Sequence, residues 1–175
     1  MAHSLAFRLE HGTAPYGRLG LAVHRWAERL WSDGVRRPVA LPAGISAIGV
    51  GGATLGGSGK SPLSIALCTA LARRGERWAM VGHAYRAVPG RARMVAPTDD
   101  VRVVGDEALV AAAALYPRVA VVVAPARQEA AEFAAHHASA LVFDGLLQAR
   151  PQPLTRSVLA LDESSPWGHI GSQSD

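Results

Sequence analysis

Thr54-Leu55-Gly56-Gly57-Ser58-Gly59-Lys60-Ser61 is the stretch of this chain that decides its fold. An apolar run over residues 45–50 precedes it, and a segment with helical spacing, residues 62–74, follows it. A strand, a glycine-rich turn that ends in Lys-Ser, and a helix, in that order, are the parts of a phosphate-binding P-loop. The stretch therefore predicts a nucleotide-binding α/β domain.

The residue types in this stretch suit phosphate chemistry. Glycines let consecutive backbone N–H groups turn inward around a phosphate, and the helix that follows points its positive end at the same place. Lys60 would reach the β- and γ-phosphates, and the Ser61 hydroxyl would bind Mg²⁺. A glycine-rich turn that happens to hold a lysine is the alternative, which the flanking strand and helix weigh against. The candidate nucleotide-binding residues are Thr54, Gly56, Gly57, Ser58, Gly59, Lys60 and Ser61.

The use of lysine supports this interpretation. The chain has 18 Lys and Arg residues together, and Lys60 is its single lysine. A compact ammonium group reaches between two phosphates more readily than a planar guanidinium does. A guanine-specific site is not supported, because its recognition motif needs a further lysine.

Composition limits the class of protein. With 175 residues, 49% hydrophobic and 18% charged, the chain has the size and composition of one folded domain. A net charge of +4 suits an anionic ligand, an anionic membrane surface or nucleic acid, and does not choose among them. The single cysteine, Cys68, excludes an internal disulfide and fits a reducing compartment. We expect no secretory signal and no full membrane span.

Short apolar runs alternate with helical patterns along the chain. This alternation predicts a three-layer α/β domain, P-loop NTPase-like, with a mostly parallel sheet. Ligands bind such sheets at the carboxyl ends of the strands, so the P-loop, Tyr85, Asp144 and Asp162 are expected along one edge. Residues 36–42 read as an extended connector and 86–100 as an irregular loop. Strands are expected at 45–52, 78–81, 119–124, 140–143 and 157–161, with a short one at 93–96, and helices at 62–74, 105–116 and 125–137.

An amphipathic helix is expected at residues 16–32, ahead of the first strand. Apolar side chains recur there at helical spacing, and Arg18, Arg25 and Arg29 lie off that stripe. The helix would either pack on its own domain or lie in a membrane interface, with its apolar face in the lipid and its arginines at the headgroups.

Two acidic residues are candidates for chemistry beyond the P-loop. Asp144 ends an apolar strand, a place where an acid commonly holds Mg²⁺; capping of the turn at Gly145 is the alternative. Asp106 opens a helix together with Glu107. Acids at a helix start are common because they complement its dipole, but Asp106 would also suit a base that accepts the proton of an attacking hydroxyl.

The order of these motifs resembles the tetraacyldisaccharide 4'-kinase family, whose members phosphorylate a disaccharide lipid from ATP. The P-loop is the most specific part, because the family also has Thr at its first position and Pro after the Ser/Thr, like Thr54 and Pro62 here. The resemblance spans roughly residues 15–170. Its other stretches are Ile45 to Gly52, Tyr85-Arg86, Val104-Gly105-Asp106-Glu107, Asp144-Gly145-Leu146 and Ser165-Pro166-Trp167-Gly168.

The resemblance implies a kinase that uses ATP and Mg²⁺ to phosphorylate the 4'-hydroxyl of a tetraacyldisaccharide 1-phosphate in lipid A biosynthesis. Lys60 and Asp106 would be its catalytic residues, with Asp106 as the acid/base at the sugar hydroxyl. Ser61 and Asp144 would hold the metal. The N-terminal helix would dock peripherally on the cytoplasmic face of the inner membrane, where the lipid disaccharide lies. No nucleic-acid partner is expected.

The sequence also departs from the family. Phe143 stands where the family has the first of two aspartates, and the family chain is much longer. The expected division is an N-terminal helix region at 1–34, the P-loop domain at 35–165 and a disordered tail at 166–175, without the family's second domain. A partner protein would be one source of that domain. The alternative function is a truncated or diverged, non-catalytic ATP-binding relative.

Overall fold

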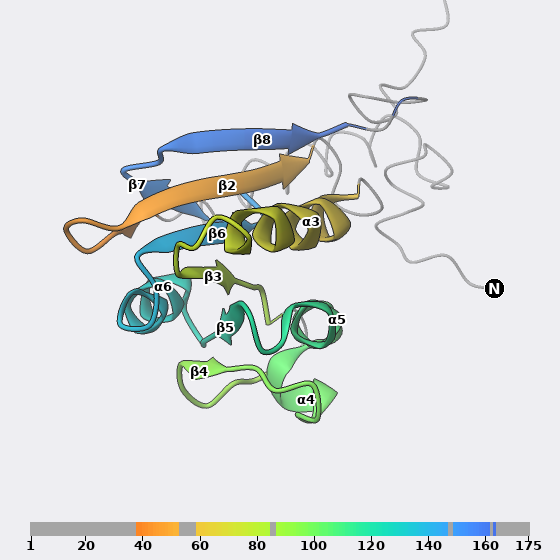
Figure 1. Ribbon diagram of the computed structural model, residues 1–175. Helices are drawn as coiled ribbons and strands as arrows, with labels where there is room; N and C mark the ends of the chain where they lie inside the picture. Colours follow the sequence, from red (N-terminus) through yellow and green to blue (C-terminus); the bar gives the residue numbers. More distant parts are fainter. Residues whose placement is uncertain (1–37, 53–58, 85–86, 147–148, 162, 164–175) are drawn as a thin grey trace, which may run out of the picture.

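The computed structural model describes residues 38–52, 59–84, 87–146, 149–161 and 163. Within these ranges the chain forms a six-stranded sheet with the order β4-β5-β3-β6-β2-β8, covered by helices (Figure 1). The strands are β2 (Ser46–Gly52), β3 (Trp78–Val81), β4 (Arg93–Met94), β5 (Ala120–Val123), β6 (Ala140–Asp144) and β8 (Arg156–Ala160). The helices are α3 (Lys60–Ala72), α4 (Val101–Val104), α5 (Asp106–Leu115) and α6 (Arg127–Ala135).

The sheet is mostly parallel, as the sequence predicts. β2 pairs in parallel with β6 and β8, and β3 pairs in parallel with β5 and β6. Only β4 among these six strands runs antiparallel, along the outer side of β5. The carboxyl ends of β2, β3, β5 and β6 therefore meet at one edge of the sheet.

Helices cover both faces of the sheet and make it the middle of three layers (Figure 1). Side chains of β6 show how one strand serves both: Val142 packs with the core under α3 and α5, and Leu141 and Phe143 pack with the core under α6. Successive residues of a strand point to opposite faces, so a sheet buried on both sides needs unbroken apolar runs. This is the physical reason why these strands could be recognised in the sequence.

Two short elements differ from the expectation. The expected extended connector contains a strand, β1 (Pro38–Ala40), which pairs in parallel with β7 (Arg150–Gln152) in a separate two-stranded sheet. Val39 is its one buried residue. A strand of three residues is too short to show a recognisable alternation of apolar and polar residues in the sequence. The one-turn helix α4 also went unpredicted, and the Asp100 side chain caps it by accepting the N–H of Arg102 at 2.8 Å.

Several expected features lie outside the described residues. These are the N-terminal helix at 16–32, the tail at 166–175, Tyr85, Arg86 and Asp162. None of the helices in the described part of the chain is long and apolar enough to cross a membrane.

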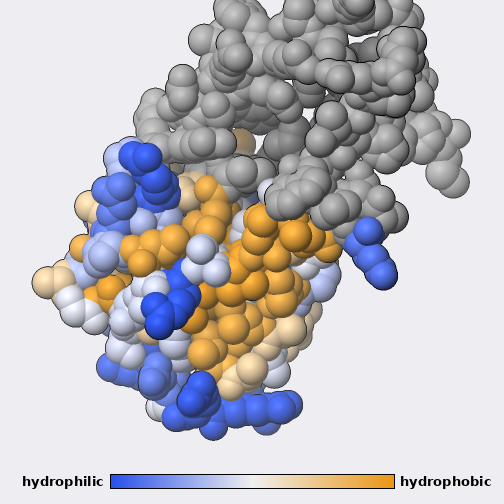
Figure 2. All heavy atoms as spheres, turned by 90° about the horizontal axis from the view of Figure 1, so that it is seen from above, coloured by the Kyte–Doolittle hydropathy of each residue, from blue (hydrophilic) through white to orange (hydrophobic). Residues whose placement is uncertain are grey.

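An apolar surface lies on the β8 side of the molecule. Figure 2 views the protein from that side and shows hydrophobic residues gathered on it. Leu159 in β8 is 53% exposed and Leu161, which follows the strand, is 45% exposed. β8 comes last in the strand order, so these leucines lie at an edge of the sheet.

Candidate functional site: a P-loop serine and a strand-end aspartate

The site is built where β2 and β6 end side by side. In the register of this parallel pair, Val50 of β2 lies opposite Asp144, the last residue of β6. The next two residues, Gly145 and Leu146, both donate their backbone N–H to the Val50 carbonyl at 3.0 Å. Gly145 allows this return because its φ of 84° lies in the region that glycine adopts without strain. The end of β6 is thereby fixed against the strand that leads into the P-loop.

The expected P-loop ends at the start of the following helix, with Gly59 at the N-cap and Lys60 and Ser61 in the first turn. Gly59 precedes α3 with a φ of 74°, a left-handed conformation that favours glycine. Lys60 and Ser61 lie in the first turn of α3, where the direction of the backbone N–H groups and the helix dipole favour an anion. The other expected phosphate-binding residues, Thr54, Gly56, Gly57 and Ser58, lie outside the described residues, and their role stays a prediction.

The Asp144 carboxylate accepts hydrogen bonds from two hydroxyl groups of α3. Ser61 Oγ donates to Asp144 Oδ2 at 3.0 Å, and Ser64 Oγ donates to Asp144 Oδ1 at 2.9 Å. Asp144 is 6% exposed and Ser64 is fully buried. The alternation along β6 explains the contact, since Asp144 follows Phe143 and so points to the face that α3 covers. The structure thus brings together the two residues that the sequence proposed as metal ligands.

The chemistry of this pair fits Mg²⁺. A carboxylate and a hydroxyl are hard oxygen donors, and Mg²⁺ is commonly held by one or two protein oxygens together with substrate phosphates and water. No group of three or more His, Cys, Asp or Glu side chains is gathered as a metal site within the described ranges. One carboxylate and one hydroxyl suit a metal whose other ligands are nucleotide phosphates and water.

Arg127, the first residue of α6, ties the strand ends together. Its Nη1 donates to the carbonyls of Val81 at 2.9 Å and Gly82 at 2.7 Å, and its Nη2 donates to the carbonyl of Asp144 at 2.7 Å. Burial lowers the pKa of Arg127 to about 10, and the charges of Asp144 and Glu107 oppose that shift. One guanidinium thereby holds the ends of β3 and β6 in fixed relation.

The two acids at the start of α5 are both exposed to solvent but differ in their electrostatic surroundings. Asp106 is exposed, and its Oδ1 accepts the backbone N–H of Glu107 at 2.9 Å. Partial desolvation, followed by the charges of Asp144 and Asp106, raises the pKa of Glu107, whereas Lys60 and Arg127 act to lower it. Glu107 therefore lies within electrostatic range of both Lys60 and Asp144. The catalytic role of Asp106 stays a prediction.

Ser64, Glu107 and Arg127 lie at the site but were not predicted as site residues, and Glu107 was noted only as an acid beside Asp106. Two of them left a signal. Ser64 is a polar residue on the buried stripe of α3, one turn after Ser61, where an apolar residue is the rule. Arg127 is a cation in the first turn of a helix, where acids are favoured. Each residue is unusual for its position in its helix, and each makes a hydrogen bond to Asp144 that explains its presence there.

Phe143 has a different place from Asp144. It is fully buried in the core under α6, so its side chain lies on the opposite face of the sheet from Ser61. The residue that replaces an aspartate of the resembled family therefore does not face the Ser61–Asp144 pair.

Comparisons with known proteins identify the family of this chain. The family model of tetraacyldisaccharide-1-P 4'-kinase matches residues 13–170. A tetraacyldisaccharide 4'-kinase of Anaeromyxobacter sp. (strain Fw109-5) is 34% identical over 174 residues, covering 91% of this chain and 47% of the relative. The enzyme of the same name from Anaeromyxobacter sp. (strain K) is 35% identical over 136 residues, covering 74% of this chain and 36% of the relative.

A solved structure shows the same fold. It is LpxK from Aquifex aeolicus, described as an "apo" form in complex with ATP, with a TM-score of 0.60 and 21% identity over 86% of this chain and 48% of that one. The present chain spans half or less of the length of these relatives. Since the family model covers most of the chain, the chain belongs to the tetraacyldisaccharide-1-P 4'-kinase family.

Proposed function

We propose that this chain is the ATP-binding part of a kinase that transfers the γ-phosphoryl group of ATP to the 4'-hydroxyl of a tetraacyldisaccharide 1-phosphate in lipid A biosynthesis. The observation that carries the proposal is the contact of Ser61 and Asp144 at the start of α3. Family membership and the relatives named tetraacyldisaccharide 4'-kinase support the choice of reaction.

In this proposal the protein contributes position and charge. The first turn of α3 and Lys60 bind the β- and γ-phosphates, and Ser61 and Asp144 hold Mg²⁺. Mg²⁺, when bound, neutralises part of the phosphate charge. Ser64 and Arg127 hold Asp144 through its carboxylate and its carbonyl, so that the acid keeps one orientation. Asp106, exposed at the start of α5, accepts the proton of the sugar hydroxyl.

The proposed location is the cytoplasmic face of the inner membrane, where the protein binds peripherally. Its support is the amphipathic pattern at residues 16–32, which lie outside the described residues. The lipid disaccharide is insoluble enough to require such a surface. A partner protein is one proposed source of residues that complete the acceptor site.

A non-catalytic ATP-binding relative is the second candidate. It is favoured by Phe143 in place of the family's first aspartate. The Ser61–Asp144 pair would be kept in such a protein, because binding of ATP with Mg²⁺ needs it whether or not transfer follows.

Calorimetry with ATP and Mg²⁺, together with a phosphotransfer assay on the tetraacyldisaccharide 1-phosphate, separates these candidates. The 175-residue chain is compared with Lys60→Ala and with Arg150→Gln, an exposed arginine on the smaller sheet. Binding and transfer that Lys60→Ala abolishes and Arg150→Gln retains support the kinase. Binding without transfer supports the second candidate, and a folded chain that binds no ATP contradicts both.

A further inference from the structure

A cavity of about 620 Å³ lies at the edge of the sheet opposite to the Ser61–Asp144 pair. Residues before or at the start of β3 and β5 line it, among them Arg77, Trp78 and Val119. Because β3, β5 and β6 are parallel, the amino ends of β3 and β5 lie away from the carboxyl end of β6, where Asp144 sits. The cavity is therefore separate from the proposed ATP site.

Most of the cavity's wall is apolar, and its charged groups come from a few residues of the lining. Trp78, Val95 and Val119 form buried parts of the lining, with 8%, 5% and 3% exposure. Tyr116 and Met94 also line it but are 65% and 41% exposed, so two large side chains stand beside its opening. A concave apolar site of this volume is within the range that binds small organic ligands.

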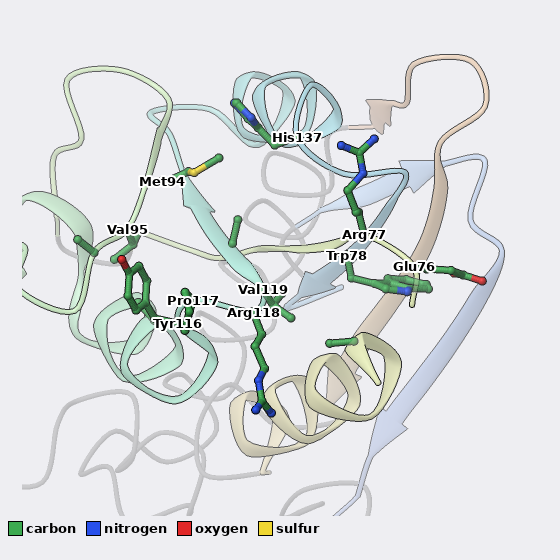
Figure 3. Close-up of a pocket in the computed structure, with 14 residues that line it drawn as sticks. Glu76, Arg77, Trp78, Met94, Val95, Tyr116, Pro117, Arg118, Val119 and His137 are labelled. Carbon is green, nitrogen blue, oxygen red and sulfur yellow. The ribbon is translucent and has the colours of Figure 1, made fainter. Parts of the chain in front are cut away.

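The charged groups of the lining are mainly basic. Arg77 and Arg118 are exposed, and Figure 3 shows their side chains on opposite sides of the pocket, with His137 on the side of Arg77. Glu76 is the one acid in the lining. Guanidinium groups beside an apolar hollow complement a ligand that has an apolar body and an anionic group.

The Trp78 indole adds a buried donor. Its Nε1 is buried and has no hydrogen-bond partner among the described residues, although buried polar atoms nearly always have one. Trp78 is itself part of the lining. Because this nitrogen has almost no accessible surface, a ligand in the cavity would contact the indole ring rather than its N–H group.

We propose that this cavity is a binding site for a soluble carboxylate with an apolar body, of the class of a medium-chain fatty acid. The apolar body packs against Trp78, Val95 and Val119, and the carboxylate pairs with Arg77 or Arg118 at the opening. The site is independent of ATP, since no residue of the Ser61–Asp144 pair lines it.

Titration of the ¹⁵N-labelled chain with decanoate, followed by NMR, tests this site. Trp78→Phe identifies the Trp78 indole signal. Decanoate is expected to shift that signal and the amide of Val119 in a saturable way, and to leave Gly59 and Ser61 in place. Decanol, the neutral analogue, is expected to bind at least about fivefold more weakly, because it lacks the charge that the arginines pair with.

Charge-removing variants complete the test. Arg77→Gln and Arg118→Gln alter exposed side chains, so the fold is kept, and the pair together is expected to weaken decanoate binding about fivefold or more. Arg150→Gln, far along the chain on β7, is expected to leave it unchanged. Equal affinity for decanoate and decanol, no effect of the paired substitution, or shifts that avoid Trp78 would each overturn the proposal.

Discussion

Ser64 Oγ donates a hydrogen bond of 2.9 Å to Asp144 Oδ1, and both residues are buried. Ser61, one turn earlier in α3, donates to the other carboxylate oxygen. The two serines have different exposure, since Ser61 is only partly buried. Ser64 therefore orients the carboxylate from within the core, and Ser61 is the hydroxyl placed to meet a metal that comes with a nucleotide.

Ser64→Ala is expected to destabilise the protein and to weaken binding of ATP with Mg²⁺. The substitution leaves a buried carboxylate oxygen without its donor, which costs about 1–3 kcal/mol. Urea unfolding followed by tryptophan fluorescence measures the stability, and calorimetry measures the affinity. The control is Thr69→Ala, which removes a hydroxyl bonded to the Ile65 carbonyl in the same helix. Similar losses in both variants would contradict a specific role of Ser64.

The parts of the site that the sequence predicted are those marked by local patterns. The apolar run of β6 and the acid at its end placed Asp144, and the glycine-rich stretch placed Ser61. Their contact follows from strand order, which places β6 beside β2. Parallel strands that are not consecutive in the chain leave no trace of their order in local spacing, so the sequence predicted one edge for both residues without predicting that they touch.

The contacts of Arg127 could not be predicted from local sequence patterns. Its three acceptors are backbone carbonyls at the ends of β3 and β6, and a carbonyl carries no side-chain signature. The pairing of β1 with β7 was hidden for a similar reason, because each strand has three residues and one buried side chain. Contacts made by backbone groups of distant segments appear only once the chain is folded.

Gly49 in β2 is expected to be intolerant of even one methyl group. A Cβ at this position would overlap Leu146 Cδ2 and lie 2.6 Å from Leu146 Cγ, whereas at Gly51 the nearest atom, Leu146 Cβ, is 3.4 Å away. Gly49→Ala should therefore lower the free energy of unfolding by about 1–3 kcal/mol, and Gly51→Ala by less. The measurement is urea unfolding of both variants.

A double-mutant cycle identifies the cause of that loss. Leu146→Ala removes the atoms that meet the new methyl group, so Gly49→Ala should cost much less in its presence. Additive losses from the two substitutions would show that the cost of Gly49→Ala arises elsewhere in β2.

Arg127→Lys is expected to destabilise the chain although it keeps a positive charge. A lysine ammonium cannot reproduce the planar fork that binds three carbonyls of two strands, so a loss of about 2–4 kcal/mol is expected. Arg150→Lys on the exposed surface of β7 is the matched control. Urea unfolding midpoints of the two variants measure the loss of stability. A loss in Arg127→Lys no larger than that in Arg150→Lys would contradict the role of Arg127 in holding the strand ends.

His83 gives the protein a stability that depends on pH. Burial, followed by the charge of Arg127, lowers the pKa of His83 from 6.5 to about 4, and Asp144 opposes the shift. The folded chain thus keeps His83 neutral where the unfolded chain protonates it, so stability is lost as pH falls from about 6.5 to about 4.

His83→Gln is expected to remove this part of the pH dependence. Glutamine does not titrate, so the stability difference between the wild-type chain and the variant should shrink as the pH is lowered through that range. Urea unfolding at several pH values between 7 and 4 measures the difference, and NMR titration of the His83 ring measures its pKa directly. His136→Gln, at the exposed end of α6, is the control. A stability difference that stays constant with pH would show that His83 titrates alike in the folded and unfolded chain.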